Sequence, residues 1–555
     1  MKKILIVLLA WLPIMAMAQE QQDSHAFKVM KHLEIFNKAY TELDQYYVDT
    51  LDAEKRLSDA LHYLMASVDP YTDFFEEQNS HALREMRTGK YAGIGSPIYF
   101  RKDLNRAVFN HPYPDMPAGK VGLRTGDIVL RIDTMDMVPR KDEDGQAFLS
   151  RVTDHLRGEA GSSFQLCVKR PWVQDSLLTF TLTREMIARP SVSIVHLTPD
   201  SIGYIRLDNY IETTTQEVKR AFLSLKQQGM KQLVLDLRSN GGGLLHEAVG
   251  VVGLFMPRGT KVVETKSKLI WLDETSETTD MPIDTTIPIV VMVNEGTASA
   301  AEITSGALQD YDRAVIVGRR TYGKGLVQTT RELPYHTALK VTISKYIIPS
   351  GRCVQAYKYE KGEPVYQPDS LAKTFYTRNG RPVKDGGGIL PDVIVEADTL
   401  PEFAFAIQGS TQTEDFCVKY QNTHPTIAPA KDFKLADAEF EDYKKFMKEQ
   451  GYAYKSRATQ LFKLLEDVAQ REHIKDFADC EAYKAVKQML VPPLESELNR
   501  HRDIIKELLE IELVRSYYSD QGVFDYSLSI DKEIQRAFEV LRNEQRYHEI
   551  LSGKK

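Results

Sequence analysis

Hydrophobic positions follow different spacings in successive parts of the chain. Across residues 24–90 apolar residues recur every three or four positions, which predicts a helical segment. Residues 91–187 carry short alternating runs between glycine-rich turns, which predicts a small β-rich domain. In residues 188–400 short, fully apolar runs alternate with helical stretches, which predicts an α/β core with buried strands. Residues 431–555 are charged and helically periodic, so we expect a helical C-terminal region.

The N-terminus has the pattern of a signal peptide. In residues 1–18, Lys2 and Lys3 precede a short apolar run, and a small-x-small sequence ends at Ala18. We therefore expect cleavage near Ala18 and an exported protein, in the periplasm or another extracytoplasmic space. An N-terminal anchor and a buried first helix are the alternatives.

Composition narrows the classes of protein. Of 555 residues, 42% are hydrophobic and 27% charged, as in globular proteins of several domains. The formal net charge of −7 argues against a nucleic-acid partner, whose binding surface needs excess cation. The cysteines show no C-x-x-C spacing, so neither a zinc module nor a disulfide scaffold is indicated, although one or two disulfides remain open.

A first candidate for chemistry is the segment 294–303, where an apolar strand leads through small residues into a helical stretch. Ser299 at such a turn would present its hydroxyl beside backbone N–H groups of a helix N-terminus, which suit an oxyanion. The alternative is simple capping of the helix by Thr297 or Ser299, with Glu302 at the complementary capping-box position.

A second candidate, residues 318–325, nearly matches a phosphate-binding loop. Gly325 stands where the magnesium-binding hydroxyl is required, and the following residues have strand character instead of helical character. Lys324 makes better sense as a general base if burial lowers its pKa, with Arg319 and Arg320 also opposing its protonation. The alternative is a solvated surface lysine.

A third segment, residues 235–243, ends a strand with three glycines that let the backbone approach a ligand. Asp236 and Arg238 can pair to hold this turn. A Ser–His–Asp site stays open, although the nearby His246 fits a helix surface better. The S-x-x-K match at 529–532 opens a charged helix and fits an N-cap.

Together, these three segments resemble the C-terminal processing peptidases, or tail-specific proteases, which are Ser–Lys serine endopeptidases. The shared features are a G-S/T-A-S-A-x-E block, a G-K-G block and an L-D-L-R-x-N-x-G-G strand end. The resemblance implies Ser299 as nucleophile, Lys324 as general base and Gln328 as the residue that orients the lysine. It implies an oxyanion hole made by the N–H groups of Gly242 and Ala300. Structural roles near the site are expected for Asp310, Asn240 and Glu302.

Residues 91–95, 117–128 and 156–161 resemble a PDZ domain, which holds a peptide as an added strand. In this family that domain presents substrate C-termini, and Ile94 and Gly95 would lie in its binding loop. The implied architecture is multidomain α+β: a helical N-terminal segment, a PDZ-like β-rich domain, an α/β peptidase core of residues 188–400 that is formed together with N-terminal elements and has ClpP/crotonase-like character, and a helical C-terminal region.

The expected function is that of an exported serine endopeptidase that binds protein C-termini and cleaves peptide bonds through an acyl-enzyme, with no metal or cofactor. Its expected partners are proteins or peptides with free C-termini, and a homo-oligomer or regulatory partner stays open. The alternative is a catalytically silent PDZ scaffold or holdase.

Overall fold

The computed structural model describes residues 24–76, 85, 88–141, 143–397 and 399–553. The predicted signal peptide, 1–18, lies outside the described residues. The chain divides into two compact units, and the smaller one combines the N-terminal residues with 330–341 and 359–363. No helix among the described residues is long and apolar enough to span a bilayer.

The described residues of the smaller unit include the helices α2 (His25–Tyr46) and α3 (Ala53–Ala66). Each begins at a polar cap: Ser24 Oγ accepts from Phe27 N at 3.2 Å, and Asp52 Oδ1 accepts from Lys55 N at 3.0 Å. Strand β1 (Asp73–Phe75) follows and pairs antiparallel with the start of β18 (Ala338–Ile347).

A β-rich domain opens the larger unit. Its sheet has the strand order β3-β4-β5-β7-β8, with β6 on β5, and a separate pair is formed by β2 and β9. The strands and helices are β2 (Lys90–Gly93), β3 (Ile98–Arg101), β4 (Arg106–Phe109), α5 (Pro117–Lys120), β5 (Ile128–Ile132), β6 (Met135–Asp136), α6 (Gly145–Leu156), β7 (Ser163–Lys169), β8 (Leu177–Thr183) and β9 (Glu185–Ala188). Phe109, Phe148 and Leu166 are fully buried between α6 and the sheet strands.

The central sheet of the α/β core has the order β10-β11-β12-β15-β16-β23. Only β10 and β11 pair antiparallel; the other pairs are parallel. Its strands are β10 (Val192–Leu197), β11 (Ile202–Leu207), β12 (Gln232–Asp236), β15 (Ile289–Val293), β16 (Val315–Gly318) and β23 (Val393–Ile394).

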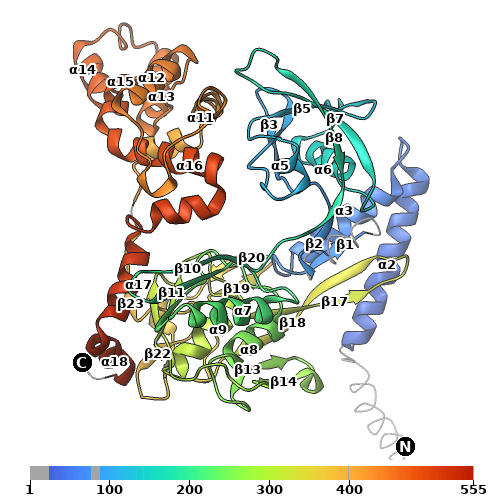
Figure 1. Cartoon of the computed structure of the whole chain (residues 1–555). Helices are drawn as coiled ribbons and strands as arrows, with labels where there is room; N and C mark the ends of the chain where they lie inside the picture. The colour runs from blue at the N-terminus through green and yellow to red at the C-terminus, as the bar shows by residue number, and fades with distance from the viewer. Residues whose placement is uncertain (1–23, 77–84, 86–87, 142, 398, 554–555) are drawn as a thin grey trace, which may run out of the picture. The chain divides into compact units, whose positions relative to one another are not determined.

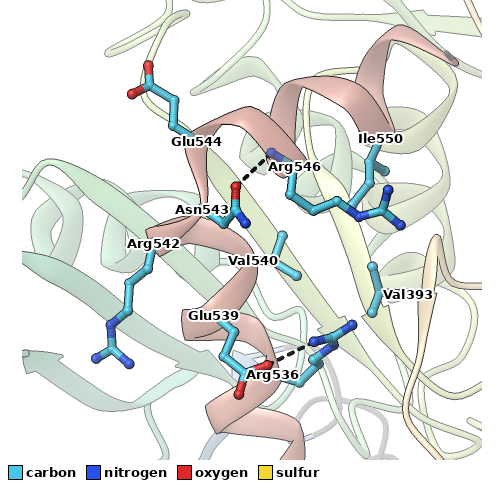
Figure 2. Close-up of a pocket in the computed structure, with 9 residues that line it drawn as sticks. All are labelled: Val393, Arg536, Glu539, Val540, Arg542, Asn543, Glu544, Arg546 and Ile550. Atoms are coloured by element: carbon cyan, nitrogen blue, oxygen red, sulfur yellow. Dashed lines mark hydrogen bonds and ion pairs between the residues drawn. The ribbon is translucent and has the colours of Figure 1, made fainter. Parts of the chain in front are cut away.

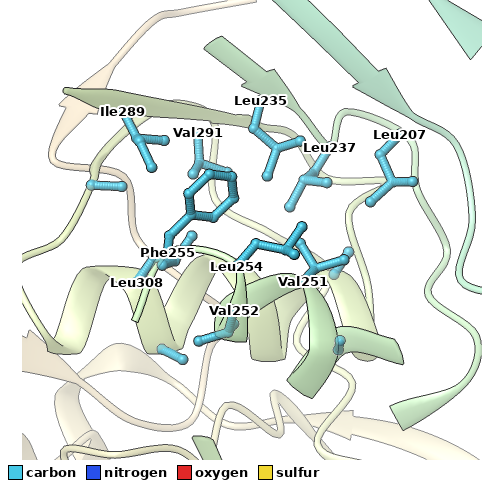
Figure 3. Close-up of a cluster of buried hydrophobic side chains, with 14 of the residues drawn as sticks. Leu207, Leu235, Leu237, Val251, Val252, Leu254, Phe255, Ile289, Val291 and Leu308 are labelled. Carbon is cyan, nitrogen blue, oxygen red and sulfur yellow. The ribbon is translucent and has the colours of Figure 1, made fainter. Parts of the chain in front are cut away.

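Both faces of this sheet are covered, which explains why its central strand β15 is apolar at every position. Helices α7 (Thr214–Gln227), α8 (Leu245–Gly253) and α9 (Ala300–Asp310) belong to one face. There Leu235, Val291 and Phe255 join a single buried cluster (Figure 3). Alternate residues such as Val234 and Met292 belong to a second cluster on the other face.

Further strands surround this core. Strand β13 (Lys261–Ser267) pairs antiparallel with β14 (Glu274–Glu277) and with the end of β18. The remaining strands are β17 (Leu326–Glu332), which pairs with β18, and the short pairs β19 (Tyr357–Glu360) with β20 (Glu363–Tyr366) and β21 (Thr374–Tyr376) with β22 (Pro382–Lys384).

Helices continue from Glu402 to near the C-terminus, so the helical region begins earlier than the predicted residue 431. They are α10 (Glu402–Gln408), α11 (Thr411–Thr423), α12 (Asp437–Glu449), α13 (Arg457–Arg471), α14 (Glu481–Leu490), α15 (Leu494–Arg500), α16 (Arg502–Ser527), α17 (Lys532–Arg542) and α18 (Glu544–Ser552). Phe440, Tyr443 and Leu513 are fully buried in the core of this helical region.

The last two helices do not belong to the helical core. Phe538 of α17 and Tyr547 of α18 are buried in the cluster that covers the second face of the central sheet (Figure 1). Residues 188–400 therefore do not supply both covers of the central sheet. The chain returns after residue 530 and adds α17 and α18 to the second face.

Candidate active site

Three adjacent parallel strands of the central sheet end at the same edge. Strands β12, β15 and β16 pair in parallel register, and each is followed by one of the three segments singled out in the sequence. Ligands of parallel sheets bind at the carboxyl ends of the strands. The segments that carry Gly242, Ser299 and Lys324 therefore start from the edge where a site is expected.

Ser299 sits in a strained turn between β15 and α9. Its backbone has φ 56° and ψ −118°, a left-handed conformation that L-residues avoid. A serine on a sharp strand-to-helix turn is the arrangement that exposes a nucleophilic hydroxyl.

The predicted capping box is present at the start of α9, with Ser299 as the N-cap and Glu302 at the third helical position. Glu302 Oε2 accepts a hydrogen bond from Ser299 N at 2.9 Å. Thr297 is not the cap, because its Oγ1 donates to Leu237 O at 2.7 Å. Capping by Ser299 and Glu302 is compatible with a catalytic role for the Ser299 hydroxyl.

Glu302 joins the serine segment to the lysine segment. Its Oε2 also accepts from Lys324 N at 2.8 Å, while Oε1 accepts from Gly323 N at 2.8 Å and Thr321 Oγ1 at 2.6 Å. The side chain is fully buried. Burial raises the pKa of Glu302 to about 7, although the Thr321 hydroxyl and the backbone amides oppose this shift.

A second connection uses Tyr346 on β18. Its hydroxyl lies 3.2 Å from Ser299 O and 2.5 Å from Lys324 O. Glu302 and Tyr346 thus tie the backbones of Ser299 and Lys324 together at their amides and at their carbonyls. Tyr346 belongs to none of the sequence motifs, and no local signal marks it.

Lys324 is partly buried, and strand β17 begins two residues later, at Leu326, where a phosphate-binding loop would begin a helix. Gln328 lies on β17, and its Nε2 donates to Thr342 Oγ1 at 3.1 Å. The neighbouring arginines are paired with carboxylates: Arg319 with Glu295 and Glu533, and Arg320 with Asp369. Their charges are thus balanced nearby, which weakens the expectation that they oppose protonation of Lys324.

Gly242 lies against the serine. A Cβ added at this glycine would fall 2.7 Å from Ser299 Cβ and 2.9 Å from Ala300 N, and φ is +95°. Its N–H donates to Asn240 Oδ1 at 2.9 Å. Asn240 is buried, and its Nδ2 donates to Leu207 O at 2.7 Å. Ala300 is the first residue of α9, so its N–H is one of the amides that have no acceptor within the helix.

Asp310 ends α9 and lies in a buried polar cluster. Its Oδ1 accepts from Arg352 Nη2 at 2.8 Å, and its Oδ2 accepts from Ser350 N at 2.9 Å. Burial raises the pKa of Asp310, while Arg352 opposes that shift. Arg352 carries no motif and was not anticipated from the sequence.

Asp236 and Arg238 pair as expected, with Nη2 of the arginine 2.8 Å from Oδ2 of the aspartate. The His246 side chain is 69% exposed on α8, as expected for a helix surface. All four cysteines carry free thiols.

Two hollows lie outside this sheet edge. Ile94 and Gly95 line a hollow of about 220 Å³ together with Tyr91, Leu156 and Arg157. A larger hollow of about 540 Å³ is formed by α17, α18 and Val393 (Figure 2). Figure 2 shows Arg536 paired with Glu539, at 2.8 Å. Arg542 pairs with Asp200 at 2.6 Å, and Arg546 lies 3.7 Å from Glu549.

The similarity of this chain to known proteins identifies its class of chemistry. The profile of Peptidase family S41 matches residues 201–364, which contain Gly242, Ser299, Lys324 and Gln328. A carboxy-terminal-processing protease of Bartonella bacilliformis is 31% identical over 364 residues, covering 64% of this chain and 80% of the relative. The chain belongs to peptidase family S41. It is a serine-type peptidase related to the carboxy-terminal-processing proteases.

Other known proteins are similar to this S41 peptidase as well. The chloroplastic C-terminal processing peptidase of Tetradesmus obliquus is 34% identical over 317 residues, 55% of this chain and 66% of the relative. A solved photosystem II D1 C-terminal processing protease is 29% identical and covers 66% of this chain and 93% of that chain, with a TM-score of 0.36. Residues 403–541 match a profile described as "Probable PDZ-protease, C-terminal helical domain".

Proposed function

We propose that this S41 peptidase is an exported endopeptidase that hydrolyses peptide bonds with Ser299 as nucleophile and Lys324 as general base. Neutral Lys324 takes the proton of Ser299 Oγ as the oxygen attacks the substrate carbonyl. When the C–N bond breaks, the lysine returns the proton to the leaving amine. Water, deprotonated by the same lysine, then attacks the acyl carbon; the bond from this carbon to Ser299 Oγ breaks, and the lysine returns the proton to Oγ, which restores both residues.

One observation carries this proposal. The Glu302 carboxylate oxygen that accepts from Ser299 N also accepts from Lys324 N, at 2.9 and 2.8 Å. A buried acceptor shared by two segments fixes their spacing, because leaving either amide without a partner would cost free energy. No histidine belongs to either segment, which favours the lysine as the base.

The oxyanion is assigned to the N–H groups of Ala300 and Gly242. Ala300 offers an amide at a helix N-terminus, where partial positive charge favours an anion. The Gly242 N–H donates to Asn240 Oδ1 before substrate binds. In the proposed reaction the substrate oxygen replaces Asn240 as its acceptor.

The β-rich domain of residues 91–187 is assigned as a PDZ domain that binds substrate C-termini. The hollow at Ile94 and Gly95 lies between the loop before β3 and the end of α6, and Arg157 and Arg189 also line it. Arg157 is paired with Glu85, which also lines the hollow, at 3.0 Å. The backbone of the loop and Arg189 suit a terminal carboxylate, and the apolar Ile98 and Leu156 suit an aliphatic last side chain.

The decisive experiment compares cleavage of an unfolded model protein with a free apolar C-terminus. Ser299→Ala and Lys324→Ala should each lower kcat/KM at least about 1000-fold, since each removes a group that takes part in bond making. Matched controls are Ser224→Ala and Lys231→Ala at exposed positions, which should cleave like the wild type. Cleavage that persists in Ser299→Ala would contradict the assignment.

Two further measurements test the finer points. Amidation of the substrate C-terminus should raise KM without changing kcat if the terminal carboxylate is what the β-rich domain binds.

N-terminal sequencing of the protein secreted from its host should give a sequence that begins after Ala18. A retained Met1 would contradict export by this signal.

A further inference from the structure

The N-terminus of α17 meets the loops that follow two strands of the central sheet. Arg238 lies two residues beyond the end of β12, and Arg319 lies one residue beyond the end of β16. Strand β15, which leads to Ser299, lies between these two strands. The two arginines therefore flank the serine segment at the sheet edge where the site is assembled.

A single carboxylate binds both arginines. Glu533 Oε2 accepts from Arg238 Nη1 at 2.7 Å, and Glu533 Oε1 accepts from Arg319 Nη1. The Glu533 side chain is only 11% exposed, and those of Arg238 and Arg319 are 13% and 25% exposed. Charge-assisted bonds that are shielded from water are the strong ones, and a buried charge that loses its partner is costly.

The surrounding charges hold each arginine in one orientation. Asp236 accepts from Nε and Nη2 of Arg238, and Asp531 accepts from its Nη1 at 2.8 Å. Arg319 Nε donates to Glu295 at 2.8 Å, although that carboxylate is 71% exposed. Among the described partners of these arginines, Glu533 is the one shared by both.

We propose that Glu533 is a positioning residue of the peptidase, a clasp that sets the spacing between the Gly242 loop and the Lys324 loop. The clasp rests on the proposed roles of Gly242 and Lys324. Arg238 precedes Gly242 by four residues and Arg319 precedes Lys324 by five, so a shift of either guanidinium is passed along a short stretch of backbone. A small misplacement of catalytic groups costs much of the rate.

Through Glu533, helix α17 has a role in catalysis. Glu533 lies in the first turn of α17, which Asp531 caps through the amides of Glu533 and Ile534 at 2.9 and 3.0 Å. The helix docks on the sheet through Phe538 and Ala537. A residue more than 200 positions away from Lys324 thereby fixes the loop that carries the lysine.

The test is Glu533→Gln, which keeps the volume and removes the charge. We expect kcat to fall at least about tenfold while KM changes less than about threefold, because positioning acts on the reacting groups and leaves substrate binding alone. The matched control is Glu544→Gln, which removes a first-turn carboxylate from α18, where the side chain is 85% exposed. It should cleave like the wild type.

Amide hydrogen exchange gives a readout that does not depend on activity. In Glu533→Gln, exchange in residues 237–244 and 319–325 should rise at least about threefold, while exchange in α17 and in the strands stays as in the wild type. A uniform rise across α17 and the sheet would indicate a purely structural role and overturn the proposal. Unchanged exchange in either loop would overturn it too.

A double-variant cycle with Arg319→Gln completes the test. If both residues act through one contact, the loss of kcat in the double variant should match the larger single loss; multiplied losses would mean that they act independently. Should the wild type show no Ser299-dependent cleavage, the proposed function fails. The exchange data would then still decide whether Glu533 holds the two loops.

Discussion

Backbone strain at the site is concentrated in Ser299, whose left-handed φ of 56° is one that a non-glycine residue adopts at a cost of about 1–3 kcal/mol. The turn keeps this conformation because contacts with neighbouring side chains hold the backbone of Ser299 at both its amide and its carbonyl. Glu302 accepts from the Ser299 amide, and Tyr346 lies within hydrogen-bond distance of the Ser299 carbonyl. These contacts hold the half-buried Ser299 in its strained turn between β15 and α9.

Gly242 provides the sharpest residue-scale prediction. Gly242→Ala would place a methyl group 2.7 Å from Ser299 Cβ at a φ of +95°, so either the serine or the loop must move. We expect kcat/KM to fall at least about 100-fold with the protein still folded, measured by peptide cleavage and thermal unfolding. Gly241→Ala is the matched control, because a Cβ there meets nothing within 4 Å. Equal activity of both variants would contradict the close approach.

Glu302 predicts a pH dependence of stability. Its pKa is about 7 in the folded protein and 4.5 for the unperturbed group, so the folded state binds the proton more tightly. The resulting stabilisation is fully present below pH 4.5 and is lost as the pH rises through 7. Glu302→Gln cannot titrate and loses acceptors at every pH.

The measurement is the difference in unfolding free energy between wild type and Glu302→Gln, followed by urea denaturation at several pH values. Relative to the variant, the wild type should lose about 3 kcal/mol between acid and mildly alkaline pH. A difference that stays constant across this range would show that the pKa of Glu302 is the same in the folded and unfolded states.

At the scale of elements, the central sheet requires a cover on each face. The apolar alternation within β12 sends Leu235 to the cluster beneath α8 and α9, and Val234 to the cluster beneath α17. The sequence predicts buried strands from this composition. The sequence does not show which helices cover the second face. Helical periodicity identifies the apolar side of a helix but not the surface against which that side packs.

The packing of α17 is therefore testable through its central aromatic residue. Phe538→Ala should lower the unfolding free energy by about 3–5 kcal/mol, since the Phe538 side chain is 2% exposed within the sheet cluster. Glu539→Ala on the exposed side of the same helix should change it by less than about 0.5 kcal/mol. If the two variants unfold alike, α17 is not part of the core.

At the scale of the whole molecule, domain boundaries in the sequence differ from the units of the structure. The predicted core ends at 400, yet α17 and α18 return to its sheet. Residues 330–341 and 359–363 belong with the N-terminal helices, although their sequence lies within the predicted core. A change of composition along the chain shows where the type of secondary structure changes. It does not show where the chain passes from one compact unit to the other.

The sequence by itself predicted the class of chemistry, a serine-type peptidase, which the family match confirms. Its candidate residues Ser299, Lys324 and Gly242 lie in short motifs, and such motifs can be read from residue types at fixed local spacing. The same holds for the buried strands, whose apolar runs follow from burial on both faces. The Glu302 capping position could also be predicted, because a helix cap is a local arrangement.

Only the tertiary structure decided which distant residues complete the site. Tyr346, Arg352 and Glu533 belong to no motif, and each meets its partner through the fold: Tyr346 at two backbone carbonyls, Arg352 at Asp310, and Glu533 at two arginines. Hydrogen bonds and ion pairs depend on distances of a few ångströms, and those distances are set by how sheet and helices pack, which local spacing does not encode.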